Sequence, residues 1–530
     1  MPQKLSTYNN ADFTGGLNLR ADQFKLAPNE SPDMLNMEID PRGGVFMRGG
    51  VQRINTTVVP GTWAPKTLFA MYSATPYLFL SSATDVLYST GSNFTSASVP
   101  VTSTFGASFA PWGNILYMAI GEATASYKWD STTQTTTILT ANGPTWQASY
   151  TSPTNGYFPK ARHATTHAGK AWVAYTSENG TTYPNRVRWS HPNSPDNWAE
   201  SDYIDINDHG TGITALVPFS GHLLVFKQDA CYAIFGYDSD TFQVVEVSRS
   251  LGVTTPQQAV ATEQAVYFYS HPEGVMMYDG KTIQDIFEKI RPAIDLNYIA
   301  STLQSTIRIN HINRRIWLSV PYNEVTTATY NTVSFIWDPT IGDGTWTKFA
   351  TTDSVGLAAG CSFVTATGLV QHLGVHPTLQ YVLQLDIRSA QQDNITGTAA
   401  SYTSFYKTGW KNADSYVQTK MYRRPEFVTQ QTTTAMNLIV NVYRDFEQTN
   451  AYKQFNLVVD ASQSSMLWGA SVWATNTLWG AATTEAQTAY GTNIGLARTI
   501  QLKISGPLNG GKPWAINAYT LKYIPRRIRA

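Results

Sequence analysis

Six short apolar segments recur along the middle of the chain, and their spacing constrains the fold more than any other feature of the sequence. Each segment is four residues long and is followed by turn residues. Successive segments lie roughly 40 to 55 residues apart, which is close to the repeat length of four-stranded β-propeller blades. The segments are Tyr77–Leu80, Ile115–Met118, Ala171–Ala174, Leu223–Phe226, Val266–Tyr269 and Ile316–Ser319.

The repeats divide the chain into three parts and predict an all-β protein. Residues 63–388 are expected to form a β-propeller of six or seven blades, and the last blade, near 354–386, has the weakest pattern. Residues 1–62 are expected to form an extended N-terminal arm with a hairpin, because residues 40–43 (Asp-Pro-Arg-Gly) suit a type I turn. Residues 389–530 contain further strand-like runs and predict a small C-terminal β domain resembling a sandwich.

Two local patterns predict helix within this β-rich chain. Apolar residues at three- and four-residue spacing predict a short helical insert near 282–300, interrupted by Pro292. The run Ser31-Pro32-Asp33 suits a helix start, with serine as the cap and proline in the first position.

The composition agrees with a β protein and excludes several other classes. Lys and Arg number 37 and Asp and Glu number 37, and charged residues make up only 14% of the chain, against about 25% in average soluble proteins. The balanced charge argues against a general nucleic-acid binder, and the 12% aromatic content argues against disorder. We interpret the low charge as a sign that neighbouring subunits cover part of the surface.

No sequence motif supports catalysis, a cofactor or a metal site, so we predict that the protein is not an enzyme. Residues 274–282 resemble a phosphate-binding loop with the wrong glycine spacing, and residues 205–216 resemble a calcium loop that lacks its final acid. The two cysteines, Cys231 and Cys361, are expected to be buried free thiols. A propeller hydrolase with two carboxylates contributed by different blades remains an alternative.

The segment 12–50 carries a pattern of its own. It has a Gly-Gly-Leu-Asn tract, a Leu-x-Pro-Asn-Glu tract, an Asn before an acidic strand, and a closing Gly-x-x-x-Arg-x-Gly. This pattern resembles the N-terminal segment of a family of bacteriophage tail proteins. Residues 188–198, 250–280 and 514–529 resemble later parts of the same proteins. The matching residues of the first segment are Gly15, Gly16, Leu17, Asn18, Leu26, Pro28, Asn29, Glu30, Asn36, Gly44, Arg48 and Gly50.

The resemblance implies a structural protein of the virion tail, assembled in the bacterial host cytoplasm. Its expected place is the distal nozzle or hub, as one subunit of a ring, six-fold in similar proteins, that forms part of the DNA-ejection conduit. The expected partners are copies of itself, the tail tube or adaptor, and fibres or a tip, with DNA passing without specific binding. No stable membrane insertion is expected. A head-completion protein at the head–tail joint, and a minor tail protein that binds a glycan or receptor, are alternatives.

The candidate interface residues come from the resemblance and from two features near the C-terminus. Leu467-Trp-Gly-Ala470 recurs at residues 478–481, and three arginines lie in the last five residues. Gly15 and Gly16 are expected to allow a tight turn, and Arg48 is expected to pair with a backbone carbonyl or an acid. The candidates for assembly contacts are Gly15, Gly16, Leu17, Asn18, Asn29, Glu30, Asn36, Arg48, Trp468, Trp473, Trp479, Arg526, Arg527 and Arg529.

Overall fold

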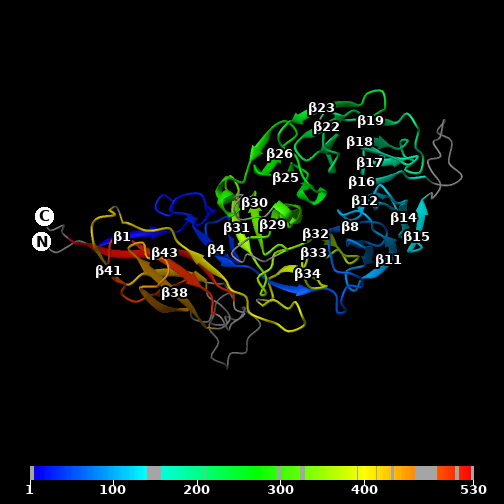
Figure 1. The fold of residues 1–530 in the computed structure, drawn as a ribbon. Coiled ribbons are helices and arrows are strands. Elements are labelled where there is room, and N and C mark those ends of the chain that lie inside the picture. The colour runs from blue at the N-terminus through cyan, green and yellow to red at the C-terminus, as the bar shows by residue number, and fades with distance from the viewer. Residues whose placement is uncertain are drawn as a thin grey trace, which may run out of the picture.

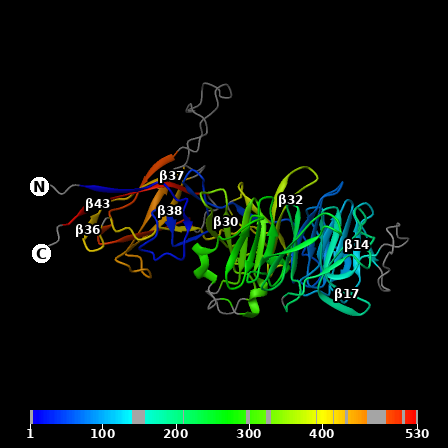
Figure 2. The same cartoon turned by 90° about the horizontal axis from the view of Figure 1, so that it is seen from above.

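The computed structural model is built almost entirely from antiparallel β-sheets (Figures 1 and 2). It describes residues 5–526 apart from 140–156, 209, 295–298, 300, 323–328, 391, 414, 431–434, 460–485 and 508–512. Within these residues seven four-stranded sheets form a β-propeller, and two larger sheets form a second unit beside it. The all-β prediction and the propeller are therefore confirmed, with seven blades.

Each blade is one four-stranded sheet whose first strand lies innermost, next to the first strands of adjacent blades. Blades 1 to 3 are β8 (Thr67–Met71), β9 (Tyr77–Ser81), β10 (Asp85–Ser89) and β11 (Thr95–Pro100); β12 (Ser108–Trp112), β13 (Ile115–Ala119), β14 (Ser126–Asp130) and β15 (Thr135–Leu139); and β16 (Lys160–His167), β17 (Lys170–Glu178), β18 (Thr181–Trp189) and β19 (Tyr203–Asp205). Blades 4 to 6 are β20 (Ala215–Phe219), β21 (His222–Phe226), β22 (Cys231–Phe235) and β23 (Gln243–Ser248); β24 (Ala259–Ala261), β25 (Val266–Ser270), β26 (Gly274–Tyr278) and β27 (Ile283–Asp285); and β28 (Arg308–Ile312), β29 (Arg315–Val320), β30 (Val333–Asp338) and β31 (Thr345–Phe349).

The six recurring apolar segments are the second strands of blades 1 to 6, namely β9, β13, β17, β21, β25 and β29. Every residue of β9, β21 and β25 is buried. A second strand is covered on both faces by the neighbouring blades, so it needs a continuous apolar run instead of alternation. This requirement explains why these strands give the strongest signal in the sequence.

Blade 7 takes its outermost strand from the N-terminal arm. Its first three strands are β32 (Ala359–Val364), β33 (Val370–Val375) and β34 (Val382–Ile387), and the fourth is β7 (Gly50–Arg53). Leu383 pairs with Arg53 and Gln384 with Gln52. The inner strand β32 also contacts β8 of blade 1, so the ring is closed. The arm is thus part of the propeller.

The second unit is a two-sheet β-sandwich that contains strands from both ends of the chain. One sheet has the order β39-β38-β42-β35-β4, and the other is centred on the long strand β43, which pairs with β1, β6, β36 and β37. The N-terminal strands are β1 (Ser6–Asn10), β4 (Asp33–Leu35), β5 (Met37–Ile39) and β6 (Val45–Met47). The C-terminal strands are β35 (Phe405–Lys407), β36 (Lys420–Tyr422), β37 (Glu426–Gln430), β38 (Met436–Arg444), β39 (Lys453–Val459), β40 (Ala486–Tyr490), β41 (Gly495–Ala497), β42 (Ile500–Ser505) and β43 (Ala515–Pro525).

The predicted N-terminal hairpin is confirmed, but the arm has far more tertiary contact than the sequence indicates. Strands β5 and β6 pair as Met37 with Met47 and Ile39 with Val45. A single hydrophobic core spans the sandwich, the arm and blades 5 and 6. Within it Phe13 packs edge-on against Tyr406 with ring centroids 5.2 Å apart. The arm therefore joins the two units of the molecule.

One helix prediction is wrong, and the helical insert predicted near 282–300 is confirmed only in part. Ser31 ends the two-residue strand β3 (Glu30–Ser31), which runs parallel to β2 (Gly16–Leu17), and β4 begins at Asp33. The segment after Asp279-Gly280 starts with strand β27, followed by the 3-10 helices η2 (Glu288–Ile294) and η3 (Ser301–Thr306). Hairpin pairing of Ile283 with Tyr278 takes the first residues of the expected helix. No helix among the described residues is long and apolar enough to cross a membrane.

Candidate functional site

Most of the residues selected from the sequence lie in one region, where the arm meets the propeller and the sandwich. We call the contact region formed by residues 12–50, strand β31 and residues 386–411 the junction. In Figure 1 the arm strand β4 lies beside β31, and these two strands are in contact. The junction is the best candidate for a functional site that the sequence identified, so we describe it residue by residue.

Arg48, which follows β6, is held at the centre of the junction with its side chain 4% exposed. Its guanidinium makes two hydrogen bonds to the Asp393 carboxylate, from Nη1 to Oδ1 at 2.9 Å and from Nη2 to Oδ2 at 2.8 Å. It also donates to the Gly49 and Ala350 carbonyls and, through Nε, to Asn36 Oδ1. All five N–H donors of the guanidinium are therefore used. The expectation that Arg48 pairs with a carbonyl or an acid is confirmed.

Aromatic rings complete the surroundings of this ion pair. The Arg48 guanidinium carbon lies 3.6 Å from the centroid of the Tyr402 ring and 4.7 Å from that of Phe349. Asp393 is fully buried and accepts further hydrogen bonds from the Val51 and Thr352 backbones. An ion pair this deeply buried is strongly destabilising when one partner is removed. Arg48 thus ties the arm, blade 6 and the connection to the sandwich into one rigid arrangement.

Asn36 supports the same arrangement from a backbone conformation that asparagine tolerates better than most residues. Its φ is +55°, in the left-handed region. Its Nδ2 donates to the Thr403 carbonyl at 2.8 Å, and its backbone N–H donates to the Lys348 carbonyl at 2.8 Å. Asn36 Oδ1 also accepts from the Ala350 backbone. One buried side chain therefore links the arm to both neighbouring units.

The Gly15–Leu17 tract lies tightly against blade 6. Gly16 has φ +64°, and a Cβ at this position would lie 2.2 Å from Thr345 Cγ2 and 2.7 Å from the Trp346 carbonyl oxygen. Leu17 is fully buried. The expectation of a tight turn is confirmed for Gly16, which combines a left-handed backbone with a close approach. A Cβ on Gly15 would meet the Glu30 side chain at 2.6 Å.

Asn18, Asn29 and Glu30 form a smaller polar group at the rim of the junction. Asn18 Nδ2 donates to Glu30 Oε2 at 2.9 Å, and the other oxygen of Glu30 lies 3.1 Å from Lys289 Nζ. Asn29 Nδ2 donates to Asp12 Oδ2 at 3.1 Å. These contacts are all within the chain. A role for the same residues between subunits stays a prediction.

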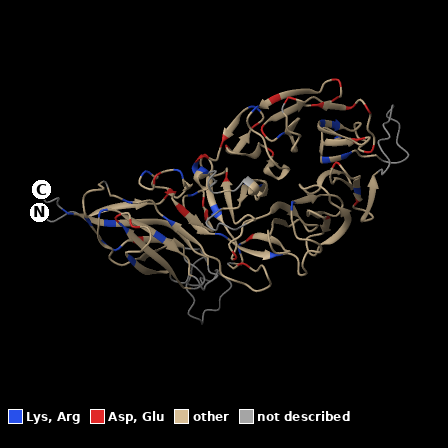
Figure 3. Cartoon of the chain, viewed as in Figure 1, with Lys and Arg blue, Asp and Glu red and all other residues tan. Residues whose placement is uncertain are grey.

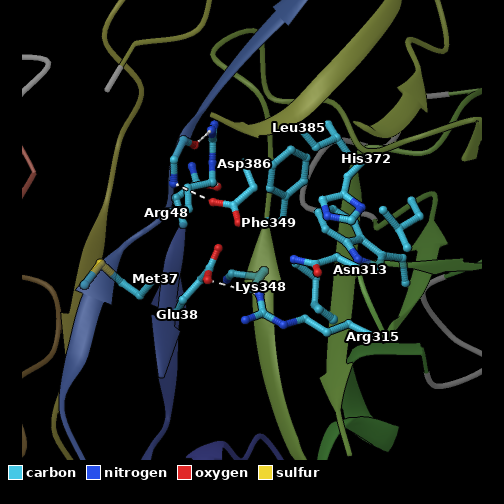
Figure 4. Close-up of a pocket in the computed structure, with 15 residues that line it drawn as sticks. Met37, Glu38, Arg48, Asn313, Arg315, Lys348, Phe349, His372, Leu385 and Asp386 are labelled. Carbon is cyan, nitrogen blue, oxygen red and sulfur yellow. Dashed lines mark hydrogen bonds and ion pairs between the residues drawn. The ribbon is translucent and has the colours of Figure 1, made fainter. Parts of the chain in front are cut away.

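A second cluster of charges in the junction was not found from the sequence. Glu38 on β5 pairs with Arg315 on β29 at 3.0 Å (Figure 4). It also pairs with Arg388 at 2.8 Å. Arg388 also pairs with Asp386 at 2.8 Å. These residues come from three separate parts of the sequence, around positions 38, 315 and 386–388, and no motif contains them, so only the fold brings them together.

The pKa values of the two acids in this cluster, Glu38 and Asp386, are shifted in opposite directions. Burial opposes ionisation of Glu38, but Arg315 and Arg388 outweigh it and hold the pKa of Glu38 below its ordinary value. Burial and the nearby Glu38 charge raise the pKa of Asp386 to about 6. The adjoining cavity, about 20 Å³, is large enough for little more than one water molecule. The cluster therefore holds the arm to the propeller and leaves no space for a substrate.

No group of three or more His, Cys, Asp or Glu side chains in the described residues is placed to hold a metal ion. Cys231 is buried, Cys361 is half-buried, and both thiols are free. Charged residues are sparse over the propeller ribbon in Figure 3.

The C-terminal interface candidates lie mostly beyond what the structure covers. The Arg526 backbone N–H donates to the Thr419 carbonyl, and its own carbonyl accepts from Gln418. The remaining candidates, Trp468, Trp473, Trp479, Arg527 and Arg529, lie outside the described residues.

Comparison with known proteins returns β-propellers and no sequence relative. No protein-family model matches the chain, and no curated protein matches it significantly. Similar solved structures include the WD40 repeats of RRP9 (8% identity, TM-score 0.38, 64% of this chain and 99% of that one). Another is the extracellular domain of BT4673 from B. thetaiotaomicron (10%, 0.41, 81% and 59%). A third is Kuenenia stuttgartiensis hydrazine synthase (13%, 0.36, 62% and 96%).

Proposed function

We propose that this protein is a structural subunit of a bacteriophage tail, forming a ring at the distal nozzle or hub that contributes to the DNA-ejection conduit. The observation that carries the proposal is that the motif residues of segment 12–50 contact both blade 6 and the sandwich. The residues that resemble tail proteins, including Gly16, Asn36 and Arg48, are those that fasten the arm to blade 6 and the sandwich. A shared motif that fixes the relative position of two units suits a load-bearing part of an assembly.

The outer edge of the propeller offers surface for neighbouring copies. The outermost strand of blade 4, β23, has its first four residues exposed, and Val244 and Val245 are 38% and 46% exposed. Phe235 and Tyr237 are exposed beside it. An uncovered strand edge with apolar side chains is a site at which a second chain can pair or pack. This surface agrees with the low overall charge of the sequence.

The propeller's own central cavity is ill suited to carry DNA. Its volume is about 510 Å³. Gln257, next to the inner strand of blade 5, donates through Nε2 to Thr67 Oγ1 on blade 1 and to the Phe105 carbonyl before blade 2. Blades 1 and 2 lie opposite blade 5 in a seven-membered ring, so this side chain crosses the cavity. The proposed conduit therefore runs between subunits of the ring.

The test is the assembly state of the purified chain followed by its position on the particle. Size exclusion with light scattering, over a range of protein concentrations, is expected to show a closed oligomer. A strict monomer at the highest concentration would contradict the ring. Negative-stain images of particles labelled with an antibody to this subunit are expected to show label at the distal tip, and label at the head–tail joint would favour the head-completion alternative.

A further inference from the structure

A pocket of about 150 Å³ opens where the inner strands of blades 6, 7 and 1 begin. It is separate from the junction and from the outer edge of the propeller. A single water needs only about 10–15 Å³ of such space, so the pocket can hold a small organic molecule. Its polar lining comes from Lys66, Thr306, Arg308, Thr329, Tyr330 and Asn331.

Arg308, the first residue of β28, is the most buried cation of this pocket, with only 7% of its surface exposed. Its Nη1 donates to the Ser305 carbonyl at 2.6 Å and to the Ile307 carbonyl at 2.9 Å. These two bonds fix the guanidinium in place while leaving its other N–H donors for a ligand. Burial lowers the pKa of Arg308 to about 10, and no acidic neighbour offsets this effect.

Lys66, which precedes β8, lines the same pocket from blade 1. Burial lowers its pKa, and the positive charge of Arg308 lowers it further. In the described part of the chain, neither cation forms an ion pair with a carboxylate, whereas most other buried arginines do, as Arg48 and Arg188 show. Two like charges held together without a counter-charge indicate a place for an anion.

Asn331 adds a hydrogen-bond acceptor to the donors of Lys66 and Arg308. It is 3% exposed, and its Nδ2 donates to the Leu357 carbonyl at 2.9 Å. Its Oδ1 is buried without a hydrogen-bond partner. Buried acceptors are rarely left unsatisfied, and Asn331 is one of the residues that line the pocket. A ligand with a hydroxyl group would satisfy it.

We propose that this pocket binds a small oxyanion that also carries a hydroxyl group, such as a sugar acid or a sugar phosphate. Lys66 and Arg308 receive the carboxylate or phosphate, and Asn331 Oδ1 accepts a hydrogen bond from the hydroxyl. Arg308 offers the paired donors that suit either kind of oxyanion, so both sources share one chemistry. The proposal is independent of a role in the phage tail.

Calorimetric titration of the full chain with four probes tests the proposal. Glucuronate and glucose 6-phosphate supply the carboxylate and the phosphate, glucose lacks the charge, and acetate lacks the hydroxyl. We expect saturable binding of glucuronate or glucose 6-phosphate, and the tighter of the two identifies the source. Glucose is expected to show no binding, and acetate to bind more weakly than glucuronate. Binding of neither acid, or binding of glucose as tight as that of the acids, would overturn the proposal.

Three variants locate the binding. Lys66→Met and Arg308→Gln are each expected to weaken anion binding about tenfold or more, the usual effect of losing a hydrogen bond to a charged group. Lys160→Met is the matched control, because Lys160 is also a half-buried lysine at the start of an inner strand but does not line the pocket. Lys66 is only partly buried, so its variant keeps the test valid if Arg308→Gln does not fold. Unchanged affinity in Lys66→Met would refute the assignment.

Discussion

Blades 6 and 7 differ from blades 1 to 5 in what covers their outermost strands. In blade 6 the outer strand β31 contacts β2, β4 and β5 of the arm, and Trp346 and Phe349 on it are 1% and 3% exposed. In blade 7 the outer strand is itself part of the arm. The outer strands of blades 1, 2, 4 and 5 are largely exposed, as the pattern of β23 shows.

The difference shows that the same four-stranded blade can have either a covered or an exposed outer strand in this chain. In blade 6, where the arm covers the outer strand, β31 carries the buried Trp346 and Phe349, and its Lys348 pairs with Asp33 of the arm. Where it does not, valines and a phenylalanine remain on the surface. The covered side of the propeller is therefore an internal interface, and the uncovered side is the part left for partners.

The largest expected effect comes from breaking the covered side at its central ion pair. Arg48→Met leaves the Asp393 carboxylate buried without its partner, so we expect the free energy of unfolding to fall by about 3–5 kcal/mol. Urea unfolding followed by tryptophan fluorescence measures the change. Arg42→Met is the control, since the Arg42–Asp40 pair is exposed and its loss is expected to have no measurable effect. Equal stability of the two variants would show that the junction does not depend on Arg48.

The next effect concerns acid and a buried histidine on an inner strand of blade 3. His163 on β16 is fully buried, and this burial lowers its pKa to about 4. The folded protein therefore binds fewer protons than the unfolded chain, so the contribution is fully present above pH 6.5 and is lost as the pH falls towards 4. The loss amounts to about 3 kcal/mol.

The variant His163→Gln isolates the contribution of His163 to the pH dependence of stability from that of other groups that titrate in the same pH range. The glutamine can keep a hydrogen bond to the Ile213 carbonyl, which His163 Nε2 contacts at 3.2 Å, but it does not titrate. We expect the difference in unfolding free energy between the two proteins to depend on pH between 6.5 and 4. Parallel pH profiles measured by denaturant titration would contradict the assignment to His163.

A smaller effect is expected from the turn that seats the arm on blade 6. Gly16→Ala adds a Cβ in a left-handed conformation and in contact with Thr345 and Trp346, at an expected cost of about 2–3 kcal/mol. Gly113→Ala, also left-handed but with open space around the added carbon, is expected to cost only about 1 kcal/mol. Thermal unfolding of the two variants measures the part due to packing, and equal losses would show that the close approach relaxes freely.

The smallest effect on stability is expected at the uncovered edge. Val245→Lys should change the unfolding free energy by less than about 0.5 kcal/mol, because the side chain is already partly exposed. If β23 contacts a second copy, the added charge should nevertheless abolish oligomers in light scattering. Val417→Lys, at a position 75% exposed on the sandwich, is the control. Oligomers that survive Val245→Lys would place the contact elsewhere.

The sequence predicts the features that depend on local pattern and misses those that depend on distant pairing. The second strands of the blades are continuous apolar runs, and Gly16 and Arg48 lie in a compact motif, so all of them are visible in the sequence. The fourth strand of blade 7 cannot be recognised in the sequence, because β7 lies far along the chain from its partner β34. Glu38, Arg315 and Asp386 become neighbours only after the ring has closed. The helix predicted near 282–300 forms only as a 3-10 helix over Glu288–Ile294, because hairpin pairing takes Ile283–Asp285 into a strand.

The pairing of β7 with β34 also determines how long β7 remains unpaired during translation. Strand β7 leaves the ribosome roughly 330 residues before its partner, a delay of about 15–65 s at 5–20 residues per second. During this interval blades 1 to 6 can form while the first part of the chain waits with an unpaired edge. Strand β1 waits longer still, since its partner β43 lies much further along the chain than β34 does. A nascent chain of this protein therefore keeps unpaired strand edges at β7 and β1 until β34 and β43 have been translated, and in this period it most needs protection from other copies translated from the same message.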